Sequence, residues 1–217
     1  MKKILLSLTL AFFAIAGFSQ KLTPVKVDSL VTVSLPSTFQ KKDTLGQHIY
    51  QANGLYGYMT VIVAPNEKNN TPLKHEKDLN SVFKNYIKNI QGQSGDGSAQ
   101  NVRDTTIGTL KAKLFTLKSD DAAENVQLIN FILIYTQDAT YTFEYVYPES
   151  RKEFIKDEYK AYASSIHLSR DLQRNDQYLL SSNGMSSTVK IALFGGGALV
   201  IILVIVVLVR RKKKLAY

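Results

Sequence analysis

The sequence predicts an α+β domain, in which a mainly antiparallel β-sheet is packed by two amphipathic helices, followed by one C-terminal transmembrane helix. Three observations lead to this prediction. Segments in which polar and apolar residues alternate are joined by short turns, as in β-hairpins. Two other segments carry apolar residues at helical spacing, and strands and helices do not alternate as they do in βαβ folds. Finally, a long uncharged apolar segment precedes a basic C-terminus.

Three strands are expected before the first helix. In LVTVSLP, residues 30–36, every second residue from Val31 is apolar and faces the same side. Residues 47–52 and 56–64 flank Asn53-Gly54, a pair that favours a tight hairpin turn. These two segments are therefore predicted to form a β-hairpin.

The first helix is expected in HEKDLNSVFKNYIKNI, residues 75–90, and a glycine-rich loop follows it. Its apolar residues recur at intervals of three and four, which is the spacing of one helix face. The second helix is expected from about Glu149 to Leu168. The predicted inner faces are Leu79, Val82, Phe83, Tyr86, Ile87 and Ile90 in the first helix, and Phe154, Ile155, Tyr159, Tyr162, Ala163 and Ile166 in the second.

Four strands are expected between the two helices. TIGTLKAKLFTLK, residues 106–118, predicts a turn at Gly108, and residues 126–136 and 139–148 form two strands around Gln137-Asp138. The last strand carries an aromatic row on one face, which we interpret as a core face covered by the helices. A ligand-binding platform is the alternative. The row consists of Tyr141, Phe143, Tyr145 and Tyr147.

The two ends of the chain predict export and anchoring. Lys2 and Lys3 precede an apolar run that ends in small residues, which is the pattern of a secretory signal peptide, here cleaved after Ser19. An uncleaved signal anchor is the alternative, although the run is shorter than the ~20 residues that span a bilayer. The predicted division is a signal peptide at 1–19, an exported domain at 20–168, a flexible juxtamembrane linker at 169–189, a transmembrane helix at 190–210 and a basic cytoplasmic tail at 211–217.

The C-terminal segment also predicts the topology. No charge lies between Ile191 and Val209, and five cations follow at 210–214, so the positive-inside rule places the C-terminus in the cytoplasm and the N-terminal domain outside it. The small residues Gly195–Gly197 allow a helix-pairing face, but the G-x-x-x-G spacing is missing. A cleaved sorting tail is a further alternative, for which neither L-P-x-T-G nor Pro-Glu-Pro is present.

Charge and cysteine content exclude several classes of function. Seven of the nine net positive charges come from Lys2, Lys3 and residues 210–214, so the exported part carries only +2, and a nucleic-acid partner is not expected. The chain has no cysteine, which excludes thiol nucleophiles, thiolate metal sites and lipoprotein anchoring. Together with the short signal, this favours a bacterial exported protein, and the C-terminal segment then predicts a single-pass protein of the cytoplasmic (inner) membrane.

No motif in the chain predicts a catalytic, cofactor or metal site, and the ligand-binding residues stay unknown. His48, His75 and His167 are far apart in sequence and lack a second ligand at short spacing. No serine lies in a G-x-S-x-G elbow. The acidic residues Asp120, Asp121 and Glu124 do not have the spacing of an EF-hand loop and are interpreted as a solvated hairpin tip.

The order of these segments resembles that of PsbP-like domains. The resemblance covers residues 25–168 and lies in VSLPSTF near the start, one amphipathic helix mid-chain, and ATYTFEYVYP leading into a helix that ends in YKAYASSIHL. That fold is best known from the extrinsic subunit of photosystem II and recurs in bacterial exported proteins. The resemblance implies a small binding or assembly module rather than an enzyme, and no functional residues carry over from it.

We therefore expect a non-enzymatic module, without a cofactor, held outside the cytoplasmic membrane by its C-terminal helix. Its expected partners are the lipid bilayer through that helix and an envelope protein or small ligand through the domain. Two alternatives are an envelope hydrolase whose active site is assembled from distant residues, and an accessory subunit of a membrane complex.

Overall fold

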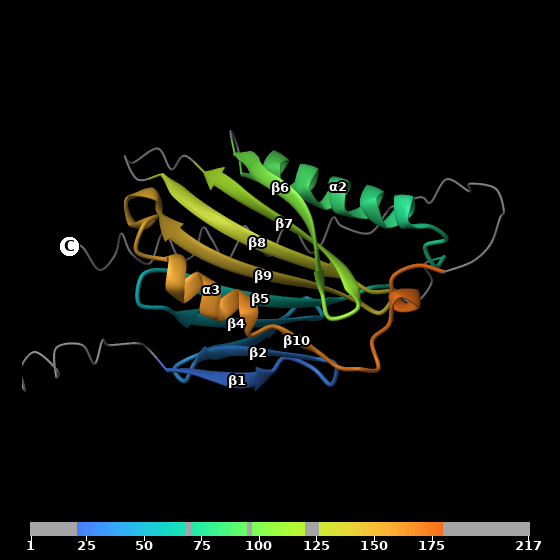
Figure 1. The fold of residues 1–217 in the computed structure, drawn as a ribbon, viewed down its shortest axis with the longest axis horizontal. Coiled ribbons are helices and arrows are strands. Elements are labelled where there is room, and N and C mark those ends of the chain that lie inside the picture. Colours follow the sequence, from blue (N-terminus) through green and yellow to red (C-terminus); the bar gives the residue numbers. More distant parts are fainter. Residues whose placement is uncertain (1–20, 68–70, 95–96, 120–125, 180–217) are drawn as a thin grey trace, which may run out of the picture.

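The computed structural model describes residues 21–67, 71–94, 97–119 and 126–179 (Figure 1). The expected signal peptide, transmembrane helix and basic tail lie outside these residues, as does the acidic segment at 120–125. Over the ranges that the structure describes, no helix combines the length and the apolar character needed to cross a membrane.

Ten strands, two α-helices and two 3-10 turns make up the described part of the chain. In chain order they are β1 (Leu22–Lys26), β2 (Val31–Pro36), β3 (Gln40–Thr44), β4 (Gln47–Asn53), β5 (Tyr58–Pro65), α2 (Glu76–Gln93), β6 (Ser98–Ile107), β7 (Leu110–Ser119), β8 (Gln127–Tyr135), β9 (Ala139–Pro148), η1 (Glu149–Arg151), α3 (Lys156–Ser164), β10 (His167–Leu168) and η2 (Arg174–Asp176).

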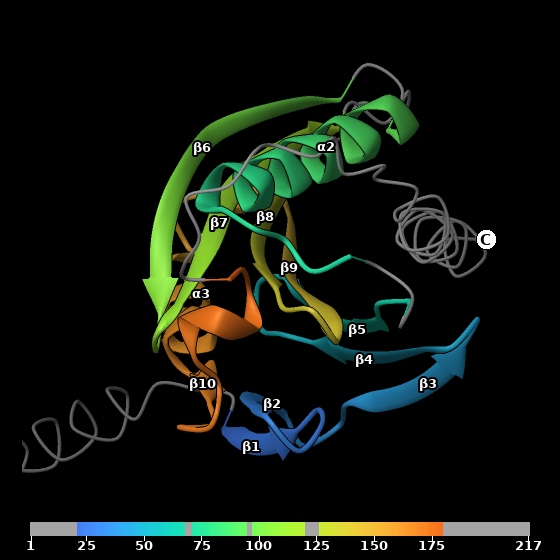
Figure 2. The same cartoon turned by 90° about the vertical axis from the view of Figure 1, so that its right-hand side faces the viewer.

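The strands form two antiparallel sheets, and this confirms the predicted fold class of a mainly antiparallel sheet packed by two helices. A seven-stranded sheet has the order β3-β4-β5-β9-β8-β7-β6, and a three-stranded sheet has the order β1-β2-β10. The large sheet curves from β6 at one edge to β3 at the other (Figure 2). The hairpin expected at Asn53-Gly54 is present, although its loop is longer than a two-residue turn, because β4 ends at Asn53 and β5 begins only at Tyr58.

Each face of the seven-stranded sheet carries its own apolar cluster. α2 covers one face, and all six residues of its predicted inner side are buried. The other face packs against β2 and α3. The aromatic row Tyr141, Phe143, Tyr145 and Tyr147 is buried on this second face. The prediction that the row is a core face is thus confirmed, but α3 and the three-stranded sheet cover it, while α2 lies on the opposite side.

The helix α2 begins with a capped first turn. The carboxylate of Asp78 accepts hydrogen bonds from the backbone N–H groups of His75 and Lys74, at 3.0 and 3.2 Å. These bonds satisfy donors that a helix start leaves unpaired. The predicted helix and its orientation are therefore correct, and it ends at Gln93, before the glycine-rich loop.

The second helix is shorter than predicted. The segment expected as one helix from about Glu149 to Leu168 consists of the turn η1, the helix α3 from Lys156 to Ser164, and the short strand β10. The turn changes the direction in which side chains point before α3 starts. As a result Phe154, which the helical spacing placed on the inner face, is 64% exposed.

Residues 169–179, which we call the C-terminal strap, are folded against the domain. The polar composition assigned them to a flexible linker, and this part of the expectation needs correction. Leu172 and Tyr178 are buried, the backbone N–H of Leu179 donates to Leu73 O at 2.9 Å, and that of Gln137 donates to Asp176 O at 2.7 Å. The ordered domain therefore extends beyond residue 168, to at least residue 179.

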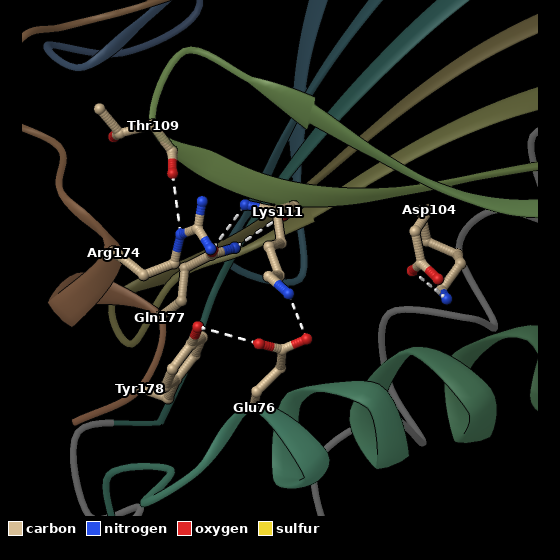
Figure 3. A network of polar contacts seen from close by, with 8 residues as sticks. Glu76, Asp104, Thr109, Lys111, Arg174, Gln177 and Tyr178 are labelled. Carbon is tan, nitrogen blue, oxygen red and sulfur yellow. Dashed lines mark hydrogen bonds and ion pairs between the residues drawn. The ribbon is translucent and has the colours of Figure 1, made fainter. Parts of the chain in front are cut away.

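Gln177 is the central residue of the strap. Its side chain is fully buried, and its amide bonds to the backbone of the neighbouring strands β7 and β8. Oε1 accepts from Lys111 N–H at 2.7 Å, and Nε2 donates to Lys111 O at 2.8 Å and to Tyr135 O at 2.9 Å. Around it, Arg174 donates to Thr109 O at 2.9 Å (Figure 3). Because side-chain amides satisfy these backbone groups, a polar segment can be as firmly attached as an apolar one.

A charged contact completes the network beside the strap. Glu76, in the first turn of α2, forms an ion pair with Lys111 and accepts a 3.4 Å hydrogen bond from the hydroxyl of Tyr178 (Figure 3). The pKa of the Glu76 carboxyl is lowered below its ordinary value, chiefly by the hydrogen bond that the Lys111 ammonium group donates to it. The strap, α2 and β7 are thus linked at one end of the domain.

Candidate functional site

The three histidines lie on three different elements. His48 lies in β4, with Nδ1 2.7 Å from Asp43 Oδ1 on the exposed edge hairpin, His75 precedes α2, and His167 lies in β10. In the part of the chain that the structure describes, no three His, Asp or Glu side chains gather in a way that could hold a metal ion. These residues therefore do not form a candidate site.

Exposed apolar side chains do gather at one end of the domain. Phe154, between η1 and α3, and Leu55, in the loop between β4 and β5, are 64% and 47% exposed. The ring of Phe154 stacks on that of Tyr56, with centroids 6.0 Å apart. We call Leu55, Tyr56 and Phe154 the apolar knob. The loop that carries Leu55 and Tyr56 lies at the left end of Figure 1, beside the start of α3.

The carboxylate of Glu158 in α3 holds the knob in place. Its Oε1 accepts from the N–H of Leu55 at 2.6 Å, and its Oε2 accepts from the N–H of Tyr56 at 2.9 Å and from the hydroxyl of Tyr145 at 2.6 Å. Arg151 adds a hydrogen bond to Tyr56 O at 3.2 Å. Hydrogen bonds to a charged group are stronger than neutral ones, so the loop is fixed to α3 and to the sheet at once. We call this arrangement the Glu158 clamp.

Tyr145 stays a hydrogen-bond donor in the clamp. Its pKa is raised above the ordinary tyrosine value, first by burial and then by the hydrogen bond to the Glu158 carboxylate, so the hydroxyl keeps its proton. Its ring packs against those of Tyr159 and Tyr162, with centroids 5.6 and 6.2 Å away. One hydrogen-bond donor of the clamp is therefore fixed in position by the packing of its ring in the aromatic core.

Two glycines make room for the clamp. A Cβ atom at Gly54 would collide with the Glu158 carboxylate, and one at Gly57 would lie 2.6 Å from Cε1 and Cζ of Tyr145. Only glycine allows the backbone to approach these side chains so closely. The sequence predicted a turn at Gly54 and placed Gly57 in a strand, and it did not indicate the close approach of either glycine to α3 or Tyr145.

The charges around the knob are balanced. Residues 149–160 contain four cations and four anions. Several are already paired, since Lys156 bonds to Glu153, Lys118 lies 3.9 Å from Glu149, and Glu158 is held in the clamp. The knob therefore presents an apolar surface with no net charge, mounted on a rigid support. Such a surface is suited to recognition of another apolar surface.

Comparisons with known proteins do not assign the chain to a family. No protein-family model matches it, and no curated protein matches it significantly. Among solved structures it is similar to cyanobacterial PsbP (CyanoP) from Synechocystis sp. PCC 6803, at 18% identity and a TM-score of 0.47, over 69% of this chain and 94% of that one. It is also similar to a protein of Bacteroides thetaiotaomicron VPI-5482, at 12% identity and a TM-score of 0.38, over 65% of this chain and 46% of that one. The first of these carries the name of the family that the sequence resembles, but similarity at this level identifies no functional residue.

Proposed function

We propose that this chain is a membrane-anchored extracytoplasmic binding or assembly module, which docks on another protein of the bacterial cell envelope through the apolar knob. The observation that carries the proposal is the exposure of Phe154 and Leu55 on an end of the domain that the Glu158 clamp holds rigid. Aromatic and aliphatic anchors on a preorganised surface are typical of binding hot spots. The export signal and the anchor expected from the sequence supply the location.

The strap supports an orientation for the domain. It ends at the opposite end of the domain from the loop of the knob (Figure 1). Ten residues, 180–189, separate the described chain from the expected transmembrane helix. Such a segment reaches at most ~35 Å when fully extended. The strap end would thus face the membrane, and the knob would point away from it, towards other envelope proteins.

The chemistry of the knob favours a protein partner with an apolar pocket. Attachment to anionic lipid requires an excess of cations, which the balanced charges of residues 149–160 do not provide. A pocket that accepts a phenyl ring and a leucine side chain would bury both and leave the paired charges at the rim. This is the usual division of a protein interface into an apolar centre and a polar rim.

Truncation of the knob is expected to weaken partner binding. A photo-crosslinking residue placed at position 55 or 154 of the full-length chain in its membrane should give one discrete adduct, whose protein component mass spectrometry identifies. Binding of that purified component should then weaken by about 2 kcal/mol, roughly 30-fold, for Phe154→Ala, and to a smaller extent for Leu55→Ala.

Leu45 provides a matched control. It is 77% exposed in the turn between β3 and β4, at the far end of β4 from the knob. Leu45→Ala should leave the affinity unchanged, and a photo-crosslinking residue at position 45 should not give the same adduct. Equal affinities for Phe154→Ala and Leu45→Ala would show that the knob is not the docking surface.

A further inference from the structure

A buried acidic side chain lies on the face that α2 covers, with one of its carboxyl oxygens unpaired. Glu144, in the middle of β9, is directly opposite Thr60 of β5 and Phe131 of β8. Its side chain is only 1% exposed, and its Oε1 has no hydrogen-bond partner within the described residues. The hydroxyl oxygen of Thr60 is also buried without one. A charged carboxylate at such a position would be costly, because burial removes it from solvent.

Among the described residues, two tyrosines are the titratable groups that interact electrostatically with Glu144. Tyr86 of α2 lies over this part of β9, with its hydroxyl 2.7 Å from Thr142 Oγ1, and Tyr162 of α3 approaches from the other face, donating to Thr60 O at 3.0 Å. Burial raises the pKa of both tyrosines, so both are neutral near pH 7. Burial is likewise the cause that raises the pKa of Glu144, from its ordinary value of 4.5 to about 8.

We propose that Glu144 is a pH-sensitive latch: its carboxyl group is protonated in the folded domain, and its ionisation loosens the packing of α2 against the sheet. The unfolded chain releases this proton near the ordinary value, whereas the folded chain keeps it until about pH 8. Between these values the folded state binds the additional proton. The contribution of the protonated Glu144 to the free energy of unfolding is therefore fully present below about pH 4.5, and it is lost as the pH rises towards 8. An alkaline environment would thus release the helix that covers one face of the sheet.

The test compares the unfolding of three forms of the full-length chain in detergent. Far-UV circular dichroism at increasing urea, repeated from about pH 5 to pH 9, gives the unfolding equilibrium constant at each pH. The ratio of this constant in the unmodified chain to that in Glu144→Gln should rise about tenfold per pH unit between about pH 5 and pH 8 and then level off. Glu67→Gln, which neutralises an exposed glutamate, should keep the pH dependence of the unmodified chain. A ratio for Glu144→Gln that does not change with pH would overturn the proposal.

Two further measurements keep the proposal testable if Glu144→Gln fails to fold. The infrared absorption of a protonated carboxylic acid should persist in the unmodified folded chain at neutral pH and disappear on unfolding. Hydrogen-exchange protection of the α2 amides, corrected for the intrinsic exchange rate, should fall between about pH 6 and pH 9, while that of the β4–β5 amides changes less. Absence of the protonated acid band in the folded chain, or equal loss of protection in both segments, would contradict the latch.

Discussion

A chain that ends after residue 168 is expected to be less stable by about 3–5 kcal/mol than one that ends after residue 179, although both contain every predicted strand and helix. The longer chain keeps the strap, with Leu172 and Tyr178 buried and Gln177 bonded to Lys111 and Tyr135. Each buried apolar side chain contributes about 1.5–3 kcal/mol, and each backbone group left unpaired costs about 1–3 kcal/mol. The conformational freedom that the strap would regain offsets part of this sum.

Urea unfolding of the two truncated chains, both starting at residue 20, measures the difference directly. A loss of this size is a large part of the 5–15 kcal/mol that stabilises a typical domain. Equal unfolding midpoints and slopes would show that the strap contributes nothing. In the full-length chain Gln177→Ala should account for much of the loss. Gln173→Ala is its control, because that exposed side chain bonds within the strap, to Arg170 O and at the start of η2.

The parts of the fold that could be predicted are those where burial dictates the residue pattern. The aromatic row of β9 alternates because one face of that strand lies in the core, and the spacing of Leu79, Phe83 and Tyr86 follows from one buried side of α2. In both elements burial selects apolar residues at a regular spacing, which is two residues in the strand and three or four residues in the helix. The strand β3 was missed for the same reason, since the first four residues of QKKDT are exposed and none is buried, which leaves no pattern.

The parts that could not be predicted depend on contacts between distant residues. The sequence did not predict the knob, because Phe154 fits a helical pattern that the turn η1 interrupts. In addition, no local pattern indicates that Glu158 binds a loop about 100 residues earlier in the chain. The sequence did not predict the strap because its contacts are with distant residues: Gln177 bonds to backbone atoms of β7 and β8, and Arg174 bonds to Thr109 O in the turn before β7. Polar composition predicts solvent exposure on average, but it carries no information on such long-range partners.

Replacement of Gly57 by alanine is expected to destabilise the domain by about 2–4 kcal/mol and to abolish the geometry of the knob. The new Cβ would lie 2.6 Å from the ring of Tyr145, which Tyr159 and Tyr162 hold from other sides. Either the ring or the loop must move, and overpacking of this kind costs about 1–3 kcal/mol before any hydrogen bond is lost. Movement of either one also weakens the Glu158 clamp, because Tyr145, Leu55 and Tyr56 share that carboxylate.

Gly92 offers the matched control, since a Cβ there meets no atom within 4 Å and the residue lies in α2. Gly92→Ala should be neutral or stabilise the domain by up to about 1 kcal/mol, because alanine favours helix. If Gly57→Ala unfolds at the same urea concentration as Gly92→Ala, the close approach to Tyr145 is unimportant.

A double-mutant cycle separates the collision from other effects of the alanine at position 57. In a Tyr145→Leu background the ring is gone, so adding Gly57→Ala should cost clearly less than it does in the unmodified chain, with a coupling of about 1–3 kcal/mol.

Partner binding distinguishes the two roles of Tyr145, which are the hydrogen bond to Glu158 and the ring contact with Gly57. Tyr145→Phe removes only the hydroxyl that donates to Glu158, and so it should weaken binding through a looser loop while the ring still fills the core. If instead Tyr145→Phe left the affinity unchanged and Gly57→Ala lowered it, the ring contact rather than the clamp would position the knob.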